Sequence, residues 1–457
     1  MTNKKFKLAA MSLATAVAVS AVGPSASAVT YQLENGDVTV AENENGAFSY
    51  QGEDKDENRT YVDKDTEDNG QIIIKQAEDT TTNNTVTVEE NVTNKNGERD
   101  VDIIIDGVNV DTSDTSTPTD TPTEVSADTK EDKTIIKVGE GADVDLTVKN
   151  SNLTTGGNGI DIGVDLDGKD GGEDGDKKTN VDLTLDNTEI NLTEKDNTAG
   201  IVARDNSTVD VTLKGENTID GTDALKDAAQ EAKELGSGKT PNRNVEGIRV
   251  GGESAGDSNS GKGSTVTIKG DETGDGGSLN IDHTSAGMVI SSGSDVTLTD
   301  SADVDIKHTE AGSSTQGGRG IVQRGDLTVE DKSSLTIDTV GTGVYKIDDD
   351  KDGQVYGNFG YGIDSGDNIT VKDGSTLEIK GTQSSAIYGG KDASLTVEGS
   401  TLNIDSNGQG IQYQGDAGDI TFDNSDVNIS GNGMGISVAD GGGTNITFDH
   451  STGSVSA

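Results

Sequence analysis

Acidic side chains at every second position of one segment could bind a calcium ion. Asp348, Asp350 and Asp352 occupy positions 1, 3 and 5 of a loop whose sixth residue is Gly353. In calcium-binding loops this spacing turns oxygen ligands toward one ion, and the glycine permits a sharp turn. Position 12, which carries a bidentate glutamate in the complete loop, is Phe359 here. The segment therefore predicts half of a calcium site, and the alternative is a solvated acidic loop.

Two of the three histidines occupy equivalent positions in neighbouring segments. His283 and His308 each follow by two residues an isoleucine that ends an apolar-x-apolar triplet. If those triplets are stacked strands, the two imidazoles lie about one strand spacing apart, roughly 4.8 Å. They could then bind a metal or respond to acid, and the alternative is a polar surface ladder without a ligand. His450 falls outside this column.

The elements that must position these residues are short strands in a three-part repeat. The first strand of each unit opens with a small residue followed by isoleucine, or by methionine in one unit. These apolar residues, which we call the ladder residues, are Ile160, Ile201, Ile248, Met288, Ile321, Ile363, Ile387, Ile411 and Ile436. The last four are spaced 24, 24 and 25 residues apart, and the longer earlier spacings indicate the same unit with inserted loops.

The other two strands of the unit alternate apolar and polar residues. The second is an apolar-Thr-apolar triplet such as Leu395-Thr396-Val397, and the third has the form of Leu402-Asn403-Ile404. Because successive side chains point to opposite faces of a strand, the apolar residues face inward and each threonine faces outward. Stacking of equivalent strands then predicts a column of isoleucines inside and one column of threonines outside.

The fixed strand order with a minimal period of about 24 residues predicts an all-β fold. Its architecture is a right-handed parallel β-helix with three strands per rung, since equivalent strands of successive units run in the same direction. An antiparallel β-sandwich would instead show hairpin signals. One short inserted helix is expected from Thr222 to Leu235, with Gly236 ending it.

The residue after each ladder residue is expected to face outward. Asp364, Tyr388 and Gln412 occupy that position in three successive units, where they could hold a sugar by hydrogen bonds and ring contact. The acids of this column, Asp161 and Asp364, are separated by several units, whereas a polysaccharide lyase or hydrolase needs clustered acidic and basic groups. The pattern therefore favours glycan binding without catalysis.

The chain has a net charge of −48 and no cysteine. Such a charge repels nucleic acid and anionic lipid, which excludes them as partners, and attracts cations such as calcium. Only 29% of the residues are hydrophobic. That content suits a solenoid, because each coil buries only a thin core against its neighbours.

The N-terminus has the features of an export signal. Lys4, Lys5 and Lys7 precede an uncharged run from Leu8 to Val22, and the small-x-small pattern 26–28 follows. The run is shorter than the roughly 20 residues that span a bilayer. We therefore expect cleavage after residue 28 and a secreted or cell-surface protein without a transmembrane segment in the mature chain.

Composition divides the chain into four parts. Residues 1–28 are the signal peptide, 29–110 a β cap or early rungs, 111–133 a Thr- and Asp-rich flexible loop or linker, and 134–457 the parallel β-helix. The repeat stops inside a strand with no capping element, so we expect the natural chain to continue beyond it.

The repeat resembles the right-handed parallel β-helix proteins of bacterial surfaces, including adhesin and autotransporter passengers, and the pectate-lyase-like carbohydrate enzymes. The resemblance covers residues 134–457 and implies a fold that hosts many activities. We expect a non-catalytic surface adhesin or structural stalk that presents a β-helical surface to glycans or host surface ligands. The alternatives are a polysaccharide-active enzyme and a calcium-stabilised spacer.

Overall fold

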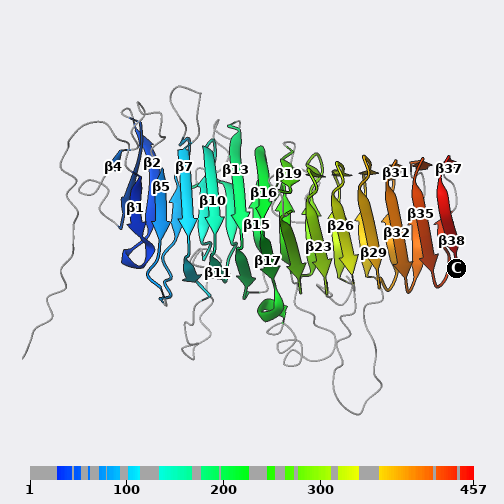
Figure 1. Cartoon of the computed structure of the whole chain (residues 1–457), viewed down its shortest axis with the longest axis horizontal. Coiled ribbons are helices and arrows are strands. Elements are labelled where there is room, and N and C mark those ends of the chain that lie inside the picture. The colour runs from blue at the N-terminus through cyan, green and yellow to red at the C-terminus, as the bar shows by residue number, and fades with distance from the viewer. Residues whose placement is uncertain are drawn as a thin grey trace, which may run out of the picture.

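The protein is a parallel β-helix built from three long sheets (Figure 1). The computed structural model describes residues 28–43, 46–52, 60–61, 71–78, 80–92, 101–113, 133–166, 177–194, 197–225, 244–252, 263–271, 276–309, 318–338, 360–414, 418–439 and 443–457. From Val86 onward, each rung contributes one strand to each sheet, in the order sheet B, sheet A, sheet C. The predicted all-β solenoid with three strands per rung is confirmed.

Sheet A contains the apolar-Thr-apolar triplets. Its strands, in spatial order, are β1 (Val29–Gln32), β5 (Ile72–Lys75), β7 (Val101–Asp106), β10 (Asp143–Lys149), β13 (Thr179–Asp186), β16 (Ser207–Lys214), β19 (Thr265–Lys269), β22 (Asp295–Thr299), β25 (Asp326–Val329), β28 (Asn368–Val371), β31 (Ser394–Glu398), β34 (Ile420–Asp423) and β37 (Ile446–Asp449).

Sheet B contains the ladder residues. Its strands are β4 (Thr60–Tyr61), β3 (Gly46–Gln51), β2 (Val38–Asn43), β6 (Val86–Val88), β9 (Ile136–Gly139), β12 (Ile160–Val164), β15 (Thr198–Ala203), β18 (Val245–Val250), β21 (Ala286–Ile290), β24 (Arg319–Gln323), β27 (Tyr361–Ser365), β30 (Ser385–Gly389), β33 (Gln409–Tyr413) and β36 (Ile436–Val438).

Sheet C completes each rung. Its strands are β8 (Asn109–Asp111), β11 (Asn152–Thr155), β14 (Glu189–Leu192), β17 (Glu216–Asp220), β20 (Ser278–Asp282), β23 (Asp303–Lys307), β26 (Ser334–Asp338), β29 (Thr376–Lys380), β32 (Thr401–Ser406), β35 (Asp426–Gly431) and β38 (Thr452–Ser456).

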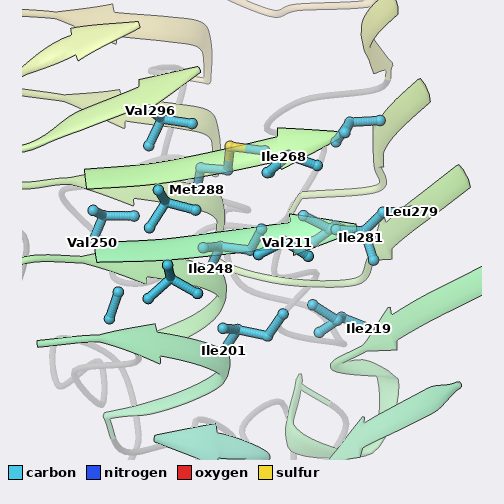
Figure 2. Packing of buried hydrophobic residues seen from close by; sticks show 14 of the residues in the cluster. Ile201, Val211, Ile219, Ile248, Val250, Ile268, Leu279, Ile281, Met288 and Val296 are labelled. Atoms are coloured by element: carbon cyan, nitrogen blue, oxygen red, sulfur yellow. The ribbon is translucent and has the colours of Figure 1, made fainter. Parts of the chain in front are cut away.

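The ladder residues pair in register along sheet B and form one wall of the core. Each pairs with the next in parallel, from Ile160 to Ile436. Figure 2 shows Ile201, Ile248 and Met288 stacked along this wall with Ile219 and Ile281 of sheet C beside them. All ladder residues except the last are at most 1% exposed. Burial of each such side chain contributes about 1.5–3 kcal/mol, which explains how a chain with few hydrophobic residues holds together.

The outward threonines form two columns instead of the predicted single one. Register pairs Asp210 of β16 with Thr267 of β19, and Thr212 with Lys269. The threonines of the long strands β10, β13 and β16 therefore lie two residues closer to the carboxyl ends of the strands than the threonines of the later strands do. The three strands are seven or eight residues long and β19 has five, and β16 continues for two residues past the position at which β19 ends.

The solenoid begins before residue 134. Strands β1, β5 and β7 pair in parallel at the start of sheet A, and a 3₁₀ turn, η1 (Leu33–Asn35), links β1 to β2. Strand β2 pairs in parallel with β6, and β3 and β4 extend the edge of sheet B in antiparallel fashion. Residues 29–110 thus contain early rungs together with an antiparallel extension.

The inserted helix and the last rung show where the regular pattern changes. Helical residues are described from Thr222 to Leu225, and the remainder of the predicted helix lies outside the described residues. At the other end, the inward residues Ile446, Phe448 and Val455 are 43%, 51% and 46% exposed. They are exposed because β36, β37 and β38 each have a neighbour on one side only.

Candidate ligand-binding face on sheet B

Glycines near the start of the sheet B strands interrupt the alternation of side chains. A Cβ atom on Gly247 would lie 2.4 Å from Ile281 Cγ2 and 2.4 Å from the carbonyl oxygen of Gly287, so this position faces the interior and accepts no side chain. The next residue, Ile248, is interior too. Two successive inward positions leave an outward position on each side of them.

The outer face of sheet B therefore carries two columns of side chains. The column after the ladder residues consists of Asp161, Val202, Arg249, Val289, Val322, Asp364, Tyr388, Gln412 and Ser437. The column before the glycines contains Ala199, Glu246, Ala286, Arg319, Tyr361, Ser385 and Gln409. A strict alternation of inward and outward side chains would place the second column in the interior. The sequence therefore predicted only the first column as outward-facing.

The predicted residues Asp364, Tyr388 and Gln412 lie on the consecutive strands β27, β30 and β33 and pair in register. The second column adds four neighbours to them. We call the combined group the tyrosine patch, and it consists of Arg319, Tyr361, Asp364, Ser385, Tyr388, Gln409 and Gln412.

Asp364 holds two arginine side chains at one end of the tyrosine patch. Its Oδ2 atom lies 3.2 Å from Arg319 Nε and 3.2 Å from Arg324 Nη2, and its carbonyl oxygen accepts a hydrogen bond from Arg324 Nη1 at 2.8 Å. The carboxylate is 9% exposed, whereas the Arg324 side chain is 41% exposed. One carboxylate therefore contacts two guanidinium groups, and Asp364 positions both arginines.

Tyr361 and Tyr388 form the aromatic centre of the patch. Their ring centroids are 4.8 Å apart with an interplanar angle of 29°. Burial raises the pKa of the Tyr361 hydroxyl above its usual value, and a hydrogen bond with Ser384 opposes that effect. The Tyr388 hydroxyl donates to Gln414 Oε1 at 2.9 Å. The half-buried rings therefore present apolar edges together with fixed hydroxyl groups.

Amide groups complete the patch beyond the tyrosines. Ser385 Oγ donates to Gln412 Oε1 at 2.8 Å, which uses the Gln412 acceptor and leaves its two N–H donors for a ligand. Gln409 Oε1 is buried and has no hydrogen-bond partner among the described residues. An unpaired buried acceptor costs about 1–3 kcal/mol, so a ligand hydroxyl or a water that reached it would relieve that cost.

The middle of the sheet B face is closed to ligands. Ala286, Val289 and Val322 form an apolar cluster on the outer side of the sheet, separate from the core, and each is at most 6% exposed. Next to them, Arg249 Nε contacts Glu246 Oε2 at 2.5 Å, and both side chains are almost completely buried. This stretch is packed like an interior surface, whereas Arg319, Tyr361, Tyr388, Gln409 and Gln412 of the tyrosine patch are partly exposed.

The two aspartates of the column after the ladder residues, Asp161 and Asp364, do not form a catalytic pair. Asp161 is bound by Arg204 through two contacts of 2.7 and 2.8 Å, and Asp364 is bound by its own arginines. Four strands, β15, β18, β21 and β24, separate them. At ~4.8 Å per strand the two carboxylates lie roughly 24 Å apart. Glycosidases need two carboxyl groups within about 10 Å, so these two aspartates cannot work together on one bond.

The outer face of sheet A carries a shallow acidic groove of about 380 Å³. A column of aspartates lines it, namely Asp102, Asp145, Asp182 and Asp210. Lys269 closes the column, since its Nζ atom lies 2.7 Å from Asp210 Oδ2, and this hydrogen bond raises the pKa of the lysine. The groove suits cations and amines, whereas the tyrosine patch suits neutral or acidic ligands.

The predicted calcium ligands Asp348, Asp350 and Asp352 lie outside the described residues. Within the described residues, two clusters have the side chains to bind a metal, namely Asp282 with His283 and His308, and Asp423 with Asp449 and His450. The first of these brings together the two histidines singled out in the sequence. Calcium binding by the acidic segment stays a prediction.

Comparison of the chain with family models, with curated proteins and with solved structures gives no match. The fold defines the class, a parallel β-helix protein. None of these comparisons adds support for the resemblance to adhesins and autotransporter passengers. Among the described residues, no helix has the length and apolar character needed to cross a membrane.

Proposed function

We propose that the protein is an exported, non-catalytic glycan-binding protein of the cell surface or the secreted fraction, and that the tyrosine patch is its binding site. The observation that carries the proposal is the pairing of Tyr361 with Tyr388 at 4.8 Å, beside arginine and glutamine donors, on one accessible stretch of an otherwise closed face. The basic N-terminal segment, its uncharged run and the small-x-small pattern at residues 26–28 support export.

The chemistry of the patch suits a sugar chain. Sugars offer apolar C–H groups and many hydroxyls, which match half-buried aromatic rings flanked by fixed hydrogen-bond donors and acceptors. The positions repeat along the rod at the strand spacing, so an extended polymer can contact several rungs at once. Arg319 and Arg324 add a preference for sugars that carry a carboxylate, because they supply local positive charge in a chain of net charge −48.

The test is retention of the purified protein on immobilised polysaccharides. Plant, mucin-type and capsular polysaccharides, both neutral and uronic-acid-containing, would be compared for the unmodified protein and for Tyr388→Ser. We expect retention of at least one polymer, and a loss of about tenfold in affinity for Tyr388→Ser, in line with the ~0.5–1.5 kcal/mol of an aromatic contact.

Thr396→Ala is the matched control, because Thr396 is a half-exposed outward residue of sheet A on the strand that follows β30 in the chain. Unchanged retention of Tyr388→Ser, or an equal loss in the control, would contradict the assignment of the patch. New chain ends in the polysaccharide would contradict the non-catalytic proposal. Absence of retention on every polymer would favour the structural stalk or calcium-stabilised spacer.

A further inference from the structure

A second cluster of chemically active side chains lies at the carboxyl ends of three sheet C strands. Asp220 ends β17, Asp282 ends β20, and His283 and His308 directly follow β20 and β23. Asp220 pairs in register with Asp282, and Asp282 with Lys307, so the cluster spans three successive rungs. It is independent of the tyrosine patch.

The polar atoms of this cluster converge on a small volume. His308 Nδ1 lies 2.7 Å and His283 Nδ1 3.1 Å from the same oxygen, Asp282 Oδ1, and His283 Nδ1 lies 3.7 Å from Asp220 Oδ1. The two imidazole rings stack with centroids 5.0 Å apart and an interplanar angle of 22°. One carboxylate oxygen therefore faces two imidazole nitrogens at once.

His283 Nδ1 gives a second, independent observation. The atom is buried and has no hydrogen-bond partner among the described residues, even though Asp282 Oδ1 is within 3.1 Å. A short distance without alignment does not satisfy a donor or acceptor. A nitrogen enclosed by carboxylates but bonded to none of them is available to a cation.

The backbone at this position permits histidine. His283 and His308 have φ values of 50° and 48°, in the left-handed region, which histidine adopts more readily than most side chains. The equivalent residue after β29 is Gly381, with φ of 68°. The turn therefore accepts glycine as well as histidine, and the proposal rests on the contacts of the imidazoles.

We propose that Asp282, His283 and His308 form a divalent transition-metal site of the zinc class. Asp220 is a neighbouring carboxylate, and its Oδ1 atom already accepts hydrogen bonds from the backbone N–H and the hydroxyl of Thr222. Imidazole and carboxylate donors suit Zn²⁺, Cu²⁺ and Ni²⁺, whereas Ca²⁺ prefers six or more oxygens. Ligand atoms at ~2.0–2.2 Å from one tetrahedral ion lie roughly 3.4 Å from each other. The two imidazole nitrogens lie 3.1 and 2.7 Å from Asp282 Oδ1, and the ligand atoms of the three residues all lie within 4.8 Å of one another, which is close to that geometry.

A metal at this position would join two rungs at one corner of the rod. Because the ligands lie at the end of β20 and directly after β20 and β23, an ion bound only by the folded chain shifts unfolding to higher temperature as its concentration rises. The strongly negative chain also attracts cations to this corner, and both aspartates neutralise the charge of the ion.

The test uses the full protein, stripped of metal, with Co²⁺ as the spectroscopic probe and Zn²⁺ in competition. We expect one Co²⁺ with visible absorption typical of nitrogen ligation, displaced by Zn²⁺ but not by a large excess of Ca²⁺. His308→Asn should weaken binding about tenfold or more, since it removes one ligand while asparagine tolerates the left-handed conformation. Displacement by Ca²⁺ at similar concentration would overturn the proposal, because it would indicate binding by acidic groups alone.

His450→Asn is the matched control. His450 has φ of 47° and contacts Asp449 Oδ1 at 2.7 Å, so it shares the conformation and the acidic partner but lacks a second imidazole. We expect its Co²⁺ affinity to be unchanged, and a loss in this variant instead of His308→Asn would overturn the assignment. If His308→Asn failed to fold, Cu²⁺ electron paramagnetic resonance of the unmodified protein would decide, since two coordinated nitrogens support the site and none overturns it.

Discussion

The outer faces of sheets A and B differ in how strictly they repeat. From β22 to β37 the central outward residue of sheet A is threonine in every strand, namely Thr297, Thr328, Thr370, Thr396, Thr421 and Thr447. Over the same stretch, the equivalent column of sheet B changes from Val289 through Asp364 and Tyr388 to Gln412. Both faces are supported by the same inward ladders.

This difference separates the requirements of folding from those of binding. A repeated threonine satisfies the β-propensity of a half-buried outward position and stacks on itself, so sheet A needs nothing else. Sheet B has the same backbone requirement, yet it contains buried ion pairs, stacked tyrosines and unpaired amide groups. Folding alone does not call for these residues, and for this reason the proposed binding site lies on sheet B.

The largest effect should come from breaking the inward ladder on which both faces rest. Ile387 is completely buried between Ile363 and Ile411. Ile387→Asp places an unpaired charge in the core, and we expect a loss of about 4 kcal/mol or more in the free energy of unfolding. Urea and thermal denaturation followed by circular dichroism measure it. Thr396→Asp, on the outer face, is the control, and an equal loss there would contradict the inward and outward assignment.

A smaller effect should come from a contact that is specific to sheet B. Gly389 lies under the buried ring of Tyr413, and a Cβ atom at Gly389 would be 2.4 Å from that ring. We expect Gly389→Ala to cost about 1–3 kcal/mol by overpacking. At Gly390 the nearest atom would be 3.4 Å away, so Gly390→Ala should stay within about 0.5 kcal/mol in the same denaturation assay. Equal losses would indicate a backbone effect instead of overpacking.

The smallest effect should come from the acidic edge of sheet A. Burial, followed by the nearby charge of Asp326, raises the pKa of Asp295. A raised pKa in the folded state means that the protonated form is favoured, so the stabilisation is present at acidic pH and is lost as pH rises through the folded pKa. Asp295→Asn keeps an acceptor but removes the charge.

We expect Asp295→Asn to raise the Tm by about 1 °C at pH 7 and to have a smaller effect near pH 4, since exposed charge pairs contribute only a few tenths of a kcal/mol. Differential scanning fluorimetry at both pH values measures the change. A lower Tm at pH 7 would mean that the carboxylate of Asp295 makes a net favourable contact in the folded protein. The acidic edge of sheet A would then be stabilising, contrary to the prediction.

The sequence by itself determined the solenoid and its strand order. Isoleucine at a fixed place in units of about 24 residues, with alternating polar and apolar neighbours, leaves a stacked parallel arrangement as the one that buries every ladder residue. The same pattern placed Asp364, Tyr388 and Gln412 side by side, because identical register in successive rungs requires it.

Only the tertiary structure decided which side chains join them. The inward glycine exemplified by Gly247 breaks the alternation, and this moves Arg319 and Tyr361 to the outer face where a period of two assigns them to the core. Strand length shifted the threonine columns for a related reason, since register depends on where a strand bends and ends. The contacts of Asp282 with both histidines likewise depend on left-handed turns, which local composition does not specify.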